Sequence, residues 1–532
     1  MSYIGQVFRI PLGSRGLMTD EVQTRTPLDA LLKARNVVFR DGLIEKAPGS
    51  WRWNKTSFGS GIIAFYDFWP NDVIQRVFTV CRDGIVRKNV DRESQVVIAA
   101  SGSAPATLTL ASGQNPVFVT GGAESAGRNR KLFLFTGTNP VQVISGDAVT
   151  RTNLATPSAD WATSYPTFGL IHRNRLVSFG NQSDPHRIYM SDPLDHEIFT
   201  GGSTLQFSVF PGEGEKVLSA TVYKGRLFIF KAPYGAFYLD DSEPDVTNWA
   251  IRKISDTFGA ASMASSFQVL DDLFVANSTG SITSLSATQK FGDVESGDLF
   301  RALRNESFMR QTTSRNGTIN RYAFYHSDRK TALLTYQSAG GTNNDRICYL
   351  DFNDAQLPKV SWGDKDQATC LGPIKDTLHI VRPMYGAEDG YLYVMDWETR
   401  EREVDMAYTG EFQTSNFDFG QADPGLAEKM KLYDALEITF EESGNWNLSV
   451  GVFIDNVFSE TLSIPLTKQT YLNNFSLGSG DVLGRASQSF RVPLHGTGRR
   501  ISFRCYNGGL RQSFRISELS IYFRIAGEDQ KG

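Results

Sequence analysis

The chain has 532 residues, which is enough for two to four domains or for one large repeat domain with attachments. Hydrophobic residues make up 40% and charged residues 21%, a composition that supplies a sizeable core and excludes a disordered, collagen-like or coiled-coil chain. The formal net charge of −4 excludes a chain that coats nucleic acid with a uniformly basic surface.

Neither a membrane span nor a disulfide framework is visible in the sequence. No apolar run reaches the ~18 residues of a membrane-spanning helix, and the start of the chain shows no secretory signal. The cysteines have no paired short spacing, so we expect no disulfide, no zinc site and folding in a reducing cytoplasm. They are Cys81, Cys348, Cys370 and Cys505. No metal or cofactor is expected.

The charge is distributed unevenly along the chain. Residues 1–60 hold nine Lys/Arg and five Asp/Glu, and residues 485–532 hold nine Lys/Arg and three Asp/Glu. The residues between them therefore carry a net charge of −14. The sequence thus describes an acidic body with basic ends.

Residues 1–60 are predicted to form an N-terminal arm with a short helix and a first hairpin. Thr26 and Pro27 suit the cap and the first position of a helix, and the leucines of residues 28–32 recur at helical spacing. The helix would end before Asn36. Two strands then follow, joined by a turn at Asp41-Gly42.

Residues 61–404 contain a recurring phrase, in which an apolar and aromatic run, often introduced by a basic or polar residue, is followed by a turn. Its starts lie 44 to 57 residues apart. That period is typical of propeller blades, because one four-stranded blade cannot bury both of its faces without neighbours. A pair of ordinary β-sandwiches is the alternative. The seven copies begin at Arg76, Lys131, Arg175, Arg226, Asp272, Arg321 and Leu378.

Residues 405–532 have longer strands with alternating apolar and polar residues. Residues 501–506 illustrate the pattern, with Ile501, Phe503 and Cys505 on one face. Asn507-Gly508-Gly509 reads as a hairpin turn. The complete sequence therefore predicts an all-β chain, namely a β-propeller of six or seven blades with an additional β-sandwich-like C-terminal domain and a polar tail.

No convergent set of catalytic residues is apparent. The six histidines are isolated, and His186 and His196, which lie near several carboxylates, are interpreted as parts of a solvated loop. A glycosidase requires two carboxylates facing one cleft. In the adjacent pair Asp240/Asp241, however, the two side chains point to opposite faces of a strand. We therefore expect no enzyme activity, and no catalytic, cofactor-binding or metal-binding residues are assigned.

Two segments resemble those of a known family. Gly16-Leu17-Met18 leads into residues 34–49, with Ala34-Arg35-Asn36-Val37-Val38-Phe39-Arg40-Asp41-Gly42 and Pro48-Gly49 as the defining phrases. Near the end, Gly498-Arg499-Arg500-Ile501-Ser502-Phe503-Arg504, Asn507-Gly508-Gly509 and residues 514–521 form the second segment. In this order, around a blade-like array, they resemble the tail tube or nozzle proteins of short-tailed, podovirus-type bacteriophages. Ala47 stands where many relatives would carry Arg.

The resemblance implies a structural virion protein of the phage tail that is assembled in the host cytoplasm. Such proteins form a ring, usually a homohexamer, below the portal and the head-to-tail adaptor, with tail fibres as possible neighbours. The ring is a channel and gate for DNA ejection, through which genomic DNA passes without sequence-specific binding. Acidic walls would repel phosphates, because basic walls would hold DNA through counterion release.

The basic C-terminal end supplies the candidate partner-docking residues. They would bind acidic surfaces of neighbouring tail proteins, although each is also explained as a solvent-facing strand residue. They are Arg499, Arg500, Arg504, Arg511 and Arg515.

Two alternatives to a tail nozzle remain open. One is a propeller-type glycan-binding tail protein that recognises a host receptor, and the other is a glycoside hydrolase. The lack of a convergent His, Asp or Glu motif disfavours the hydrolase.

Overall fold

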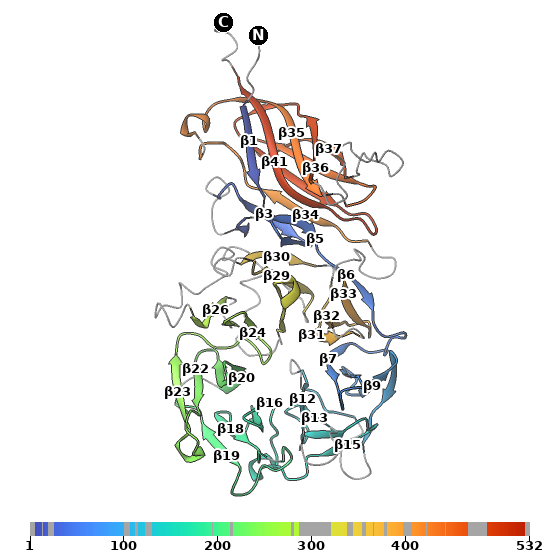
Figure 1. Ribbon diagram of the computed structural model, residues 1–532, viewed down its shortest axis with the longest axis vertical. Coiled ribbons are helices and arrows are strands. Elements are labelled where there is room, and N and C mark those ends of the chain that lie inside the picture. Colours follow the sequence, from blue (N-terminus) through green and yellow to red (C-terminus); the bar gives the residue numbers. More distant parts are fainter. Residues whose placement is uncertain are drawn as a thin grey trace, which may run out of the picture.

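The computed structural model is built from β-strands, arranged as a ring of sheets below a second, sheet-rich domain (Figure 1). Helical elements wholly inside the described residues are short 3-10 turns, such as Ala159–Trp161 and Pro424–Leu426. The predicted all-β class is confirmed. The structure describes residues 6–12, 14–19, 26–99, 107–111, 115–122, 130–193, 195–212, 216–277, 281–286, 321–337, 344–353, 358–364, 366–376, 380–396, 407–421, 423–441, 443–466 and 487–526.

The ring is a β-propeller, whose sheets are called blades 1 to 7 in the order of their first strands. Blade 1 is β7 (Ile62–Phe68), β8 (Arg76–Cys81), β9 (Val86–Val90) and β10 (Glu93–Val96). Blade 2 is β12 (Val117–Gly121), β13 (Lys131–Phe135), β14 (Gln142–Ser145) and β15 (Thr150–Asn153), with β11 (Ile98–Ala99) beside β15. Blade 3 is β16 (Phe168–His172), β17 (Arg175–Phe179), β18 (Arg187–Met190) and β19 (Leu205–Ser208).

The remaining blades continue the same antiparallel order. Blade 4 is β20 (Lys216–Tyr223), β21 (Arg226–Ala232), β22 (Ala236–Asp240) and β23 (Ala250–Ser255). Blade 5 is β24 (Ser266–Val269), β25 (Asp272–Ala276) and β26 (Ile282–Ser284). Blade 6 is β27 (Ala323–His326), β28 (Thr331–Tyr336), β29 (Arg346–Asp351) and β30 (Lys359–Gly363). Blade 7 is β31 (Cys370–Lys375), β32 (Val381–Gly386), β33 (Leu392–Asp396) and β6 (Gly49–Arg52).

The first strands of the blades close the ring. β7, β12, β16, β20, β24, β27 and β31 contact one another in this order, and β31 returns to β7. Six of the blades are separate sheets, while blade 6 is the first part of a ten-stranded sheet. Blade 7 takes its last strand, β6, from the N-terminal part of the chain, with Trp51 opposite Val394. This pairing joins the two ends of the propeller, and it satisfies the backbone groups that an open edge would leave unpaired.

The recurring phrase of the sequence marks the second strand of each of the first five blades. In each of these blades the first residue of the copy is also the first residue of the second strand. The copies at residues 76, 131, 175, 226 and 272 begin the strands β8, β13, β17, β21 and β25, respectively. The copy at Arg321 falls instead on the first strand of blade 6, and part of the copy at 378 lies outside the described residues. The period of the recurring phrase in the sequence therefore corresponds to the repeat of the blades.

The second domain contains a seven-stranded sheet. Its strands, in order, are β38 (Ser487–Pro493), β35 (Lys431–Glu441), β41 (Arg515–Ile525), β5 (Leu43–Lys46) and β4 (Val37–Arg40). Two further strands attach to it: β1 (Gln6–Pro11) pairs with β41, and β39 (Thr497–Gly498) pairs with β35. Strands from both ends of the chain therefore form one sheet.

The ten-stranded sheet connects this domain to the propeller. After β27–β30 of blade 6 it continues through β3 (Ala30–Arg35), β34 (Gly410–Thr414), β40 (Ile501–Asn507), β36 (Asn447–Ile454) and β37 (Val457–Pro465), with β2 (Gly16–Leu17) beside β3. Apolar side chains from both sheets of the domain form one core cluster, which includes Leu436, Ile438, Val450 and Phe503. The predicted strands of residues 405–526 are confirmed.

Two local predictions are wrong. The segment expected to be a helix up to Asn36 is the strand β3, which pairs with β34 and β30. A register shift between Leu31 and Lys33 breaks the alternation of the strand, which explains why its leucines imitate helical spacing. Asn507-Gly508-Gly509 is not a hairpin turn, because β40 and β41 belong to different sheets. The first hairpin, β4 with β5, forms as predicted.

Candidate functional site

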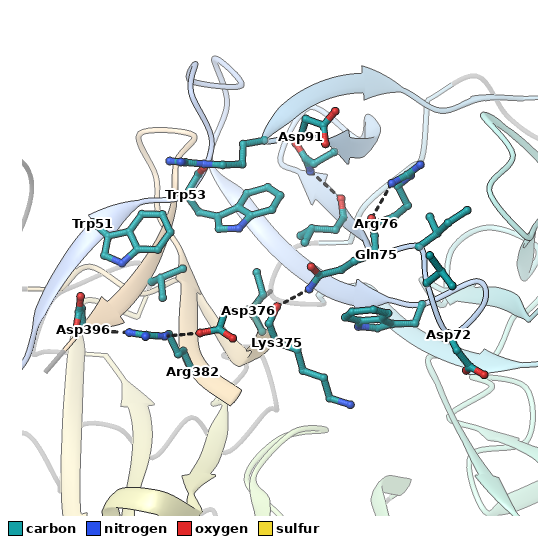
Figure 2. A pocket seen from close by; sticks show the side chains of 18 residues that line it. Trp51, Trp53, Asp72, Gln75, Arg76, Asp91, Lys375, Asp376, Arg382 and Asp396 are labelled. Carbon is teal, nitrogen blue, oxygen red and sulfur yellow. Dashed lines mark hydrogen bonds and ion pairs between the residues drawn. The ribbon is translucent and has the colours of Figure 1, made fainter. Parts of the chain in front are cut away.

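The candidate site is an open cleft where blade 7 meets blade 1, next to the strand that closes the ring (Figure 2). Its volume is about 1130 Å³. All four strands of blade 7 and the hairpins of blade 1 provide its walls. The residues that line it are Trp51, Trp53, Trp69, Asp72, Val73, Ile74, Gln75, Arg76, Val77, Asn89, Asp91, Arg92, Ile374, Lys375, Asp376, Arg382, Val394 and Asp396.

Three half-buried tryptophans give the cleft its aromatic surface. Trp51 lies on β6 and Trp53 directly follows it, so their side chains share one face of the extended chain. Their indoles lie side by side in Figure 2. The backbone N–H of Trp53 donates to the carbonyl of Leu392 at 2.7 Å, which fixes this segment on blade 7. Trp69 follows β7 and lies on the blade 1 side.

Arg92 of blade 1 binds the segment that carries Trp51 and Trp53. Its guanidinium lies over the Trp51 ring at 5.1 Å from the ring centroid. Its Nη2 donates to the carbonyl of Arg52 at 2.8 Å, and its Nε donates to the carbonyl of Trp53. The orientation of the aromatic wall is therefore set by contacts between the two blades.

A short hydrogen-bond network forms the floor between the blades. Gln75 Nε2 donates to Asp67 Oδ1 at 2.8 Å and to the carbonyl of Lys375 at 2.6 Å. The backbone N–H of Lys375 in turn donates to Asp67 Oδ2 at 2.8 Å. Burial raises the pKa of Asp67 above its ordinary value, although these hydrogen bonds act in the opposite direction. These hydrogen bonds thus fix the floor of the cleft without a bound ligand.

The charged side chains of the cleft are mostly compensated within the protein. Arg382 lies between Asp376 and Asp396, at 3.2 Å and 3.6 Å. Arg76 Nε donates to Asp147 of blade 2 at 2.7 Å. The four acidic and four basic residues of the lining leave it without a net charge. A smaller cavity of about 300 Å³ shares Arg382 and Asp396 and is also lined by His326.

The sequence interpretation did not identify this aromatic site. The available signal was the Trp-x-Trp spacing of Trp51 and Trp53, with Trp69 close behind it, since three of the eight tryptophans occur within 19 residues. What could not be read from the sequence was that residues 51–53 join a blade formed by residues 370–396.

Acidic residues at one recurring position bind basic residues of the preceding blade, and we call these contacts inter-blade pairs. Each acidic residue follows the third strand of its blade. Asp147 of blade 2 accepts from Arg76 of blade 1, and Glu197 of blade 3 accepts from Lys131 of blade 2. Asp241 of blade 4 accepts from Arg173 Nε of blade 3 at 2.8 Å. In blades 1 and 2 the basic residue that introduces the recurring phrase thus helps to join neighbouring blades, and in blade 3 Arg173 has this role.

His172 completes the most buried inter-blade pair. Its Nε2 lies 2.8 Å from Asp241 Oδ2, and both side chains are 2% exposed. Burial lowers the pKa of His172, and Arg173 acts in the same direction, against the effect of the Asp241 carboxylate. The neighbouring Asp240 points away and binds Arg252, as the strand alternation predicted.

The interpretation of His186 and His196 as parts of a solvated loop is wrong for His196, which is 3% exposed. Its Nδ1 accepts from the backbone N–H of Gly122, and its Nε2 lies 3.1 Å from the carbonyl of Asn174. Burial lowers its pKa. His196 therefore joins blades 2 and 3. His186 is half-buried, with Nδ1 at 3.2 Å from Lys231 Nζ.

The structure separates the five candidate docking arginines into two groups. Arg504 and Arg515 are engaged inside the second domain, where their guanidinium groups donate to Glu411 and Glu45. The other three lie at connections between strands: Arg499 and Arg500 follow β39, and Arg511, which is exposed, lies between β40 and β41.

The uneven distribution of charge along the sequence does not give one domain a basic and the other an acidic net charge. Because the chain ends fold together, residues 1–48 and 405–532 combine to 19 Lys/Arg and 20 Asp/Glu. Residues 49–404 hold 35 Lys/Arg and 38 Asp/Glu. The two domains therefore carry net charges of −1 and −3, and much of the basic end is neutralised by acidic neighbours.

Within the described part of the chain, no group of three or more His, Cys, Asp or Glu side chains is arranged to hold a metal ion. No helix in the same residues is long and apolar enough to cross a membrane. The four cysteines are buried and form no disulfide with one another, and burial raises the pKa of each thiol.

Comparison with known proteins gives no family for this chain. No family model matches it, and no curated protein matches it. Among solved structures it is similar to the computationally designed Ika8 protein, with a TM-score of 0.37 and 11% identity over 66% of this chain and 100% of that chain. BBS1N, solved in complex with ARL6DN, gives a TM-score of 0.40 and 9% identity over 64% and 94%. U3-55K gives a TM-score of 0.43 and 9% identity over 66% and 100%.

Proposed function

We propose that this chain is a structural protein of the virion of a short-tailed bacteriophage. Several copies, six by analogy with the resembled family, would form a ring in the tail below the portal and the head-to-tail adaptor. The ring would serve as a channel and gate through which the genomic DNA leaves. The chain would assemble in the host cytoplasm and act without catalysis.

The observation that carries this proposal is the convergence of the two segments that resemble tail proteins. They begin about 480 residues apart, yet Ile516 of the second pairs with Ile44 of the first in one sheet. Lys46 Nζ donates to the carbonyl of Gln512 at 3.0 Å. The resemblance therefore concerns one folded unit rather than two unrelated hairpins, which makes chance similarity a weaker explanation.

The junction between the domains suits a protein that carries load. Domains in one chain are usually joined through small polar interfaces that permit relative motion. Here the ten-stranded sheet continues from blade 6 into the second domain, where Arg35 on β3 pairs with Trp362 on β30. Arg35 on β3 bridges Asp364 of the propeller side at 2.6 Å and Glu411 of the second domain at 3.3 Å. A hinge at this point would have to break these bonds.

The charge of both domains is compatible with the passage of DNA. A strongly basic lumen would retain the phosphate backbone through counterion release. Neither domain has an excess of basic residues, with net charges of −1 and −3. This supports a channel that does not hold the DNA, without requiring the strongly acidic wall that the linear charge pattern suggested.

A basic and apolar corner of the second domain is the best docking surface for a partner. Asp455 Oδ1 accepts from the backbone N–H groups of Arg499 and Arg500 at 3.0 and 2.9 Å. Asp455 begins the turn that leads to Val457 and Phe458, which are 68% and 56% exposed. Two basic residues thus lie beside the turn that carries an exposed apolar tip, a composition that suits an acidic partner such as an adaptor protein.

Reconstruction of the virion tail by electron microscopy tests this proposal directly. We expect density for a ring of copies below the adaptor, with a passage along its axis. In solution, light scattering should show assembly when the purified adaptor is added. Substitution of Arg499→Glu with Arg500→Glu should weaken that assembly, while Arg252→Glu on blade 4 serves as the control. Absence of the chain from purified virions would contradict the proposal.

Glycan binding is a second candidate function, favoured by the aromatic cleft between blades 7 and 1. It is compatible with a place in the tail, because a tail component can also contact the host surface. No observation on the described residues favours the hydrolase alternative.

A further inference from the structure

We propose that the cleft between blade 7 and blade 1 binds an uncharged oligosaccharide, with Trp51 and Trp53 as its stacking platforms. This site goes beyond the structural role proposed above and does not depend on it. It adds a recognition function for the surface of a cell or for a polysaccharide that coats it.

The tryptophans provide the first argument. An indole offers a large rigid apolar face with little conformational entropy to lose, and it keeps a polar N–H at its edge. Pyranose rings present flat patches of C–H groups that fit such a face. Trp51 and Trp53 lie side by side on the same face of one strand segment, and Trp69 stands on the opposite blade. The spacing of two residues along an extended chain, about 6–7 Å, suits stacking of one extended saccharide chain.

The polar lining provides the second argument. Carboxylate and amide oxygens accept hydrogen bonds from hydroxyl groups, and ammonium and guanidinium groups donate to them. Asp91, Gln75 and Lys375 lie in the lining beside Trp53, whereas Asp72 lies on the far side of the cleft and pairs with Arg130 at 3.0 Å. Among the described residues, no basic side chain forms an ion pair with the Asp91 carboxylate, which leaves it available to a ligand. Lys375 Nζ forms no ion pair there either, although its charge acts on the buried Asp67 carboxylate.

The balance of charges argues for an uncharged ligand. Arg382 is already held by Asp376 and Asp396, and Arg76 by Asp147. The lining as a whole has no net charge, so neither a polyanion nor a polycation would gain from its field. A nucleic acid would require a basic groove, and the four carboxylates of this cleft oppose it.

The site is also preformed and large enough. Gln75, Asp67 and the backbone of Lys375 fix the floor, and Arg92 fixes the aromatic wall. A volume of about 1130 Å³ exceeds that of an ordinary small-molecule pocket and accommodates several sugar rings. Preorganisation lowers the entropic cost of binding.

The test uses the full chain and four neutral probes: maltohexaose, cellohexaose, chitohexaose and an α-mannohexaose. Binding is followed by the change in tryptophan fluorescence and by saturation-transfer NMR at millimolar probe concentrations. We expect at least one probe to bind. Trp51→Ala or Trp53→Ala should weaken its binding about tenfold or more, since one stacking contact is lost. Trp249→Ala on blade 4 is the matched control and should leave binding unchanged.

Circular dichroism and thermal melting establish that each variant folds. If Trp51→Ala fails to fold, Trp51→Phe and Lys375→Ala replace it, and both should weaken binding while the melting temperature stays near that of the parent chain. The proposal is overturned if none of the four probes binds the parent chain. It is also overturned if the Trp51→Ala/Trp53→Ala double variant still binds the saccharide, or if peptides bind in the cleft and the saccharides do not.

Failure of the saccharide site leaves the proposed tail assembly unaffected, because the two proposals have separate readouts. Ring formation with an adaptor is measured by light scattering and should be the same for Trp51→Ala and the parent chain. A variant that loses saccharide binding but still assembles separates the two roles.

Discussion

Arg515 of the last strand donates a hydrogen bond from Nε to Glu45 Oε2 at 3.2 Å and so joins two residues that are 470 positions apart. Glu45 is 2% exposed and Arg515 is 16% exposed. Arg515 also lies 3.6 Å from Glu441 on β35. One guanidinium therefore connects the first hairpin, the strand β35 and the C-terminal strand β41 within one domain.

Replacement of Arg515 by Met should destabilise the second domain by about 2 kcal/mol, because a buried carboxylate loses one of its charged partners. The double variant Glu45→Met/Arg515→Met should recover much of this loss, since it removes both buried charges together. Urea unfolding of the four members of this double-mutant cycle measures the coupling. Equal destabilisation by the double and the single variant would show that the pair contributes only through packing.

The stability of the domain junction should depend on pH through Glu411, which is 1% exposed. Burial pushes the pKa of Glu411 upward, but hydrogen bonds from Lys33 and Arg504 outweigh it and hold the pKa below its ordinary value. Such a group stabilises the folded state fully above its unfolded-state pKa of about 4.3. This contribution is lost as the pH falls through the lower folded-state pKa.

The parent chain should therefore be more stable than Glu411→Gln at neutral pH, and the difference should shrink as the pH falls from about 5 to about 3. Denaturant midpoints measured at several pH values give the comparison. Glu460→Gln, on the exposed edge strand β37, is the control and should change little. A gap that stays constant with pH would mean that Glu411 acts through its shape rather than through its charge.

The inter-blade pairs should contribute to stability in the order of their burial. Asp241 is 2% exposed and Asp147 is 36% exposed. Asp241→Ala leaves His172 and Arg173 without their acceptor and should cost about 2–3 kcal/mol. Asp147→Ala removes a half-exposed carboxylate that binds Arg76 and Lys88, and Lys88 Nζ keeps the backbone carbonyl of residue 147 as an acceptor at 2.8 Å. This change should cost less than about 1 kcal/mol. Thermal unfolding of both variants tests this order, and the reverse order would refute the importance of burial here.

Gly169 on β16 should tolerate no side chain, because a Cβ there would overlap the ring of Phe135 in the neighbouring blade. Phe135 is fully buried and has no room to move. Gly169→Ala should therefore destabilise the propeller by about 1–3 kcal/mol. Gly202→Ala is the control, since no atom lies within 4 Å of its new Cβ. A melting temperature for Gly169→Ala equal to that of the control would contradict this packing.

The sequence by itself determined the fold class, because local patterns carry it. The alternation of apolar and polar residues marked strands such as β35 and β40, and the period of about 50 residues marked the blades. The opposite orientation of Asp240 and Asp241 also follows from the local pattern of a strand. These features depend on neighbours in the sequence, so they are readable from it.

Only the tertiary structure decided which distant segments become neighbours. β3 has the spacing of a helix but is a strand, because hydrogen bonds to β34 and β30 outweigh local preference. The aromatic cleft exists because residues 51–53 complete a blade formed by residues 370–396. The basic chain ends meet acidic partners such as Glu45 and Glu411, which removes the charge contrast seen along the chain. Pairing across hundreds of residues is set by the whole packed molecule, and no local pattern encodes it.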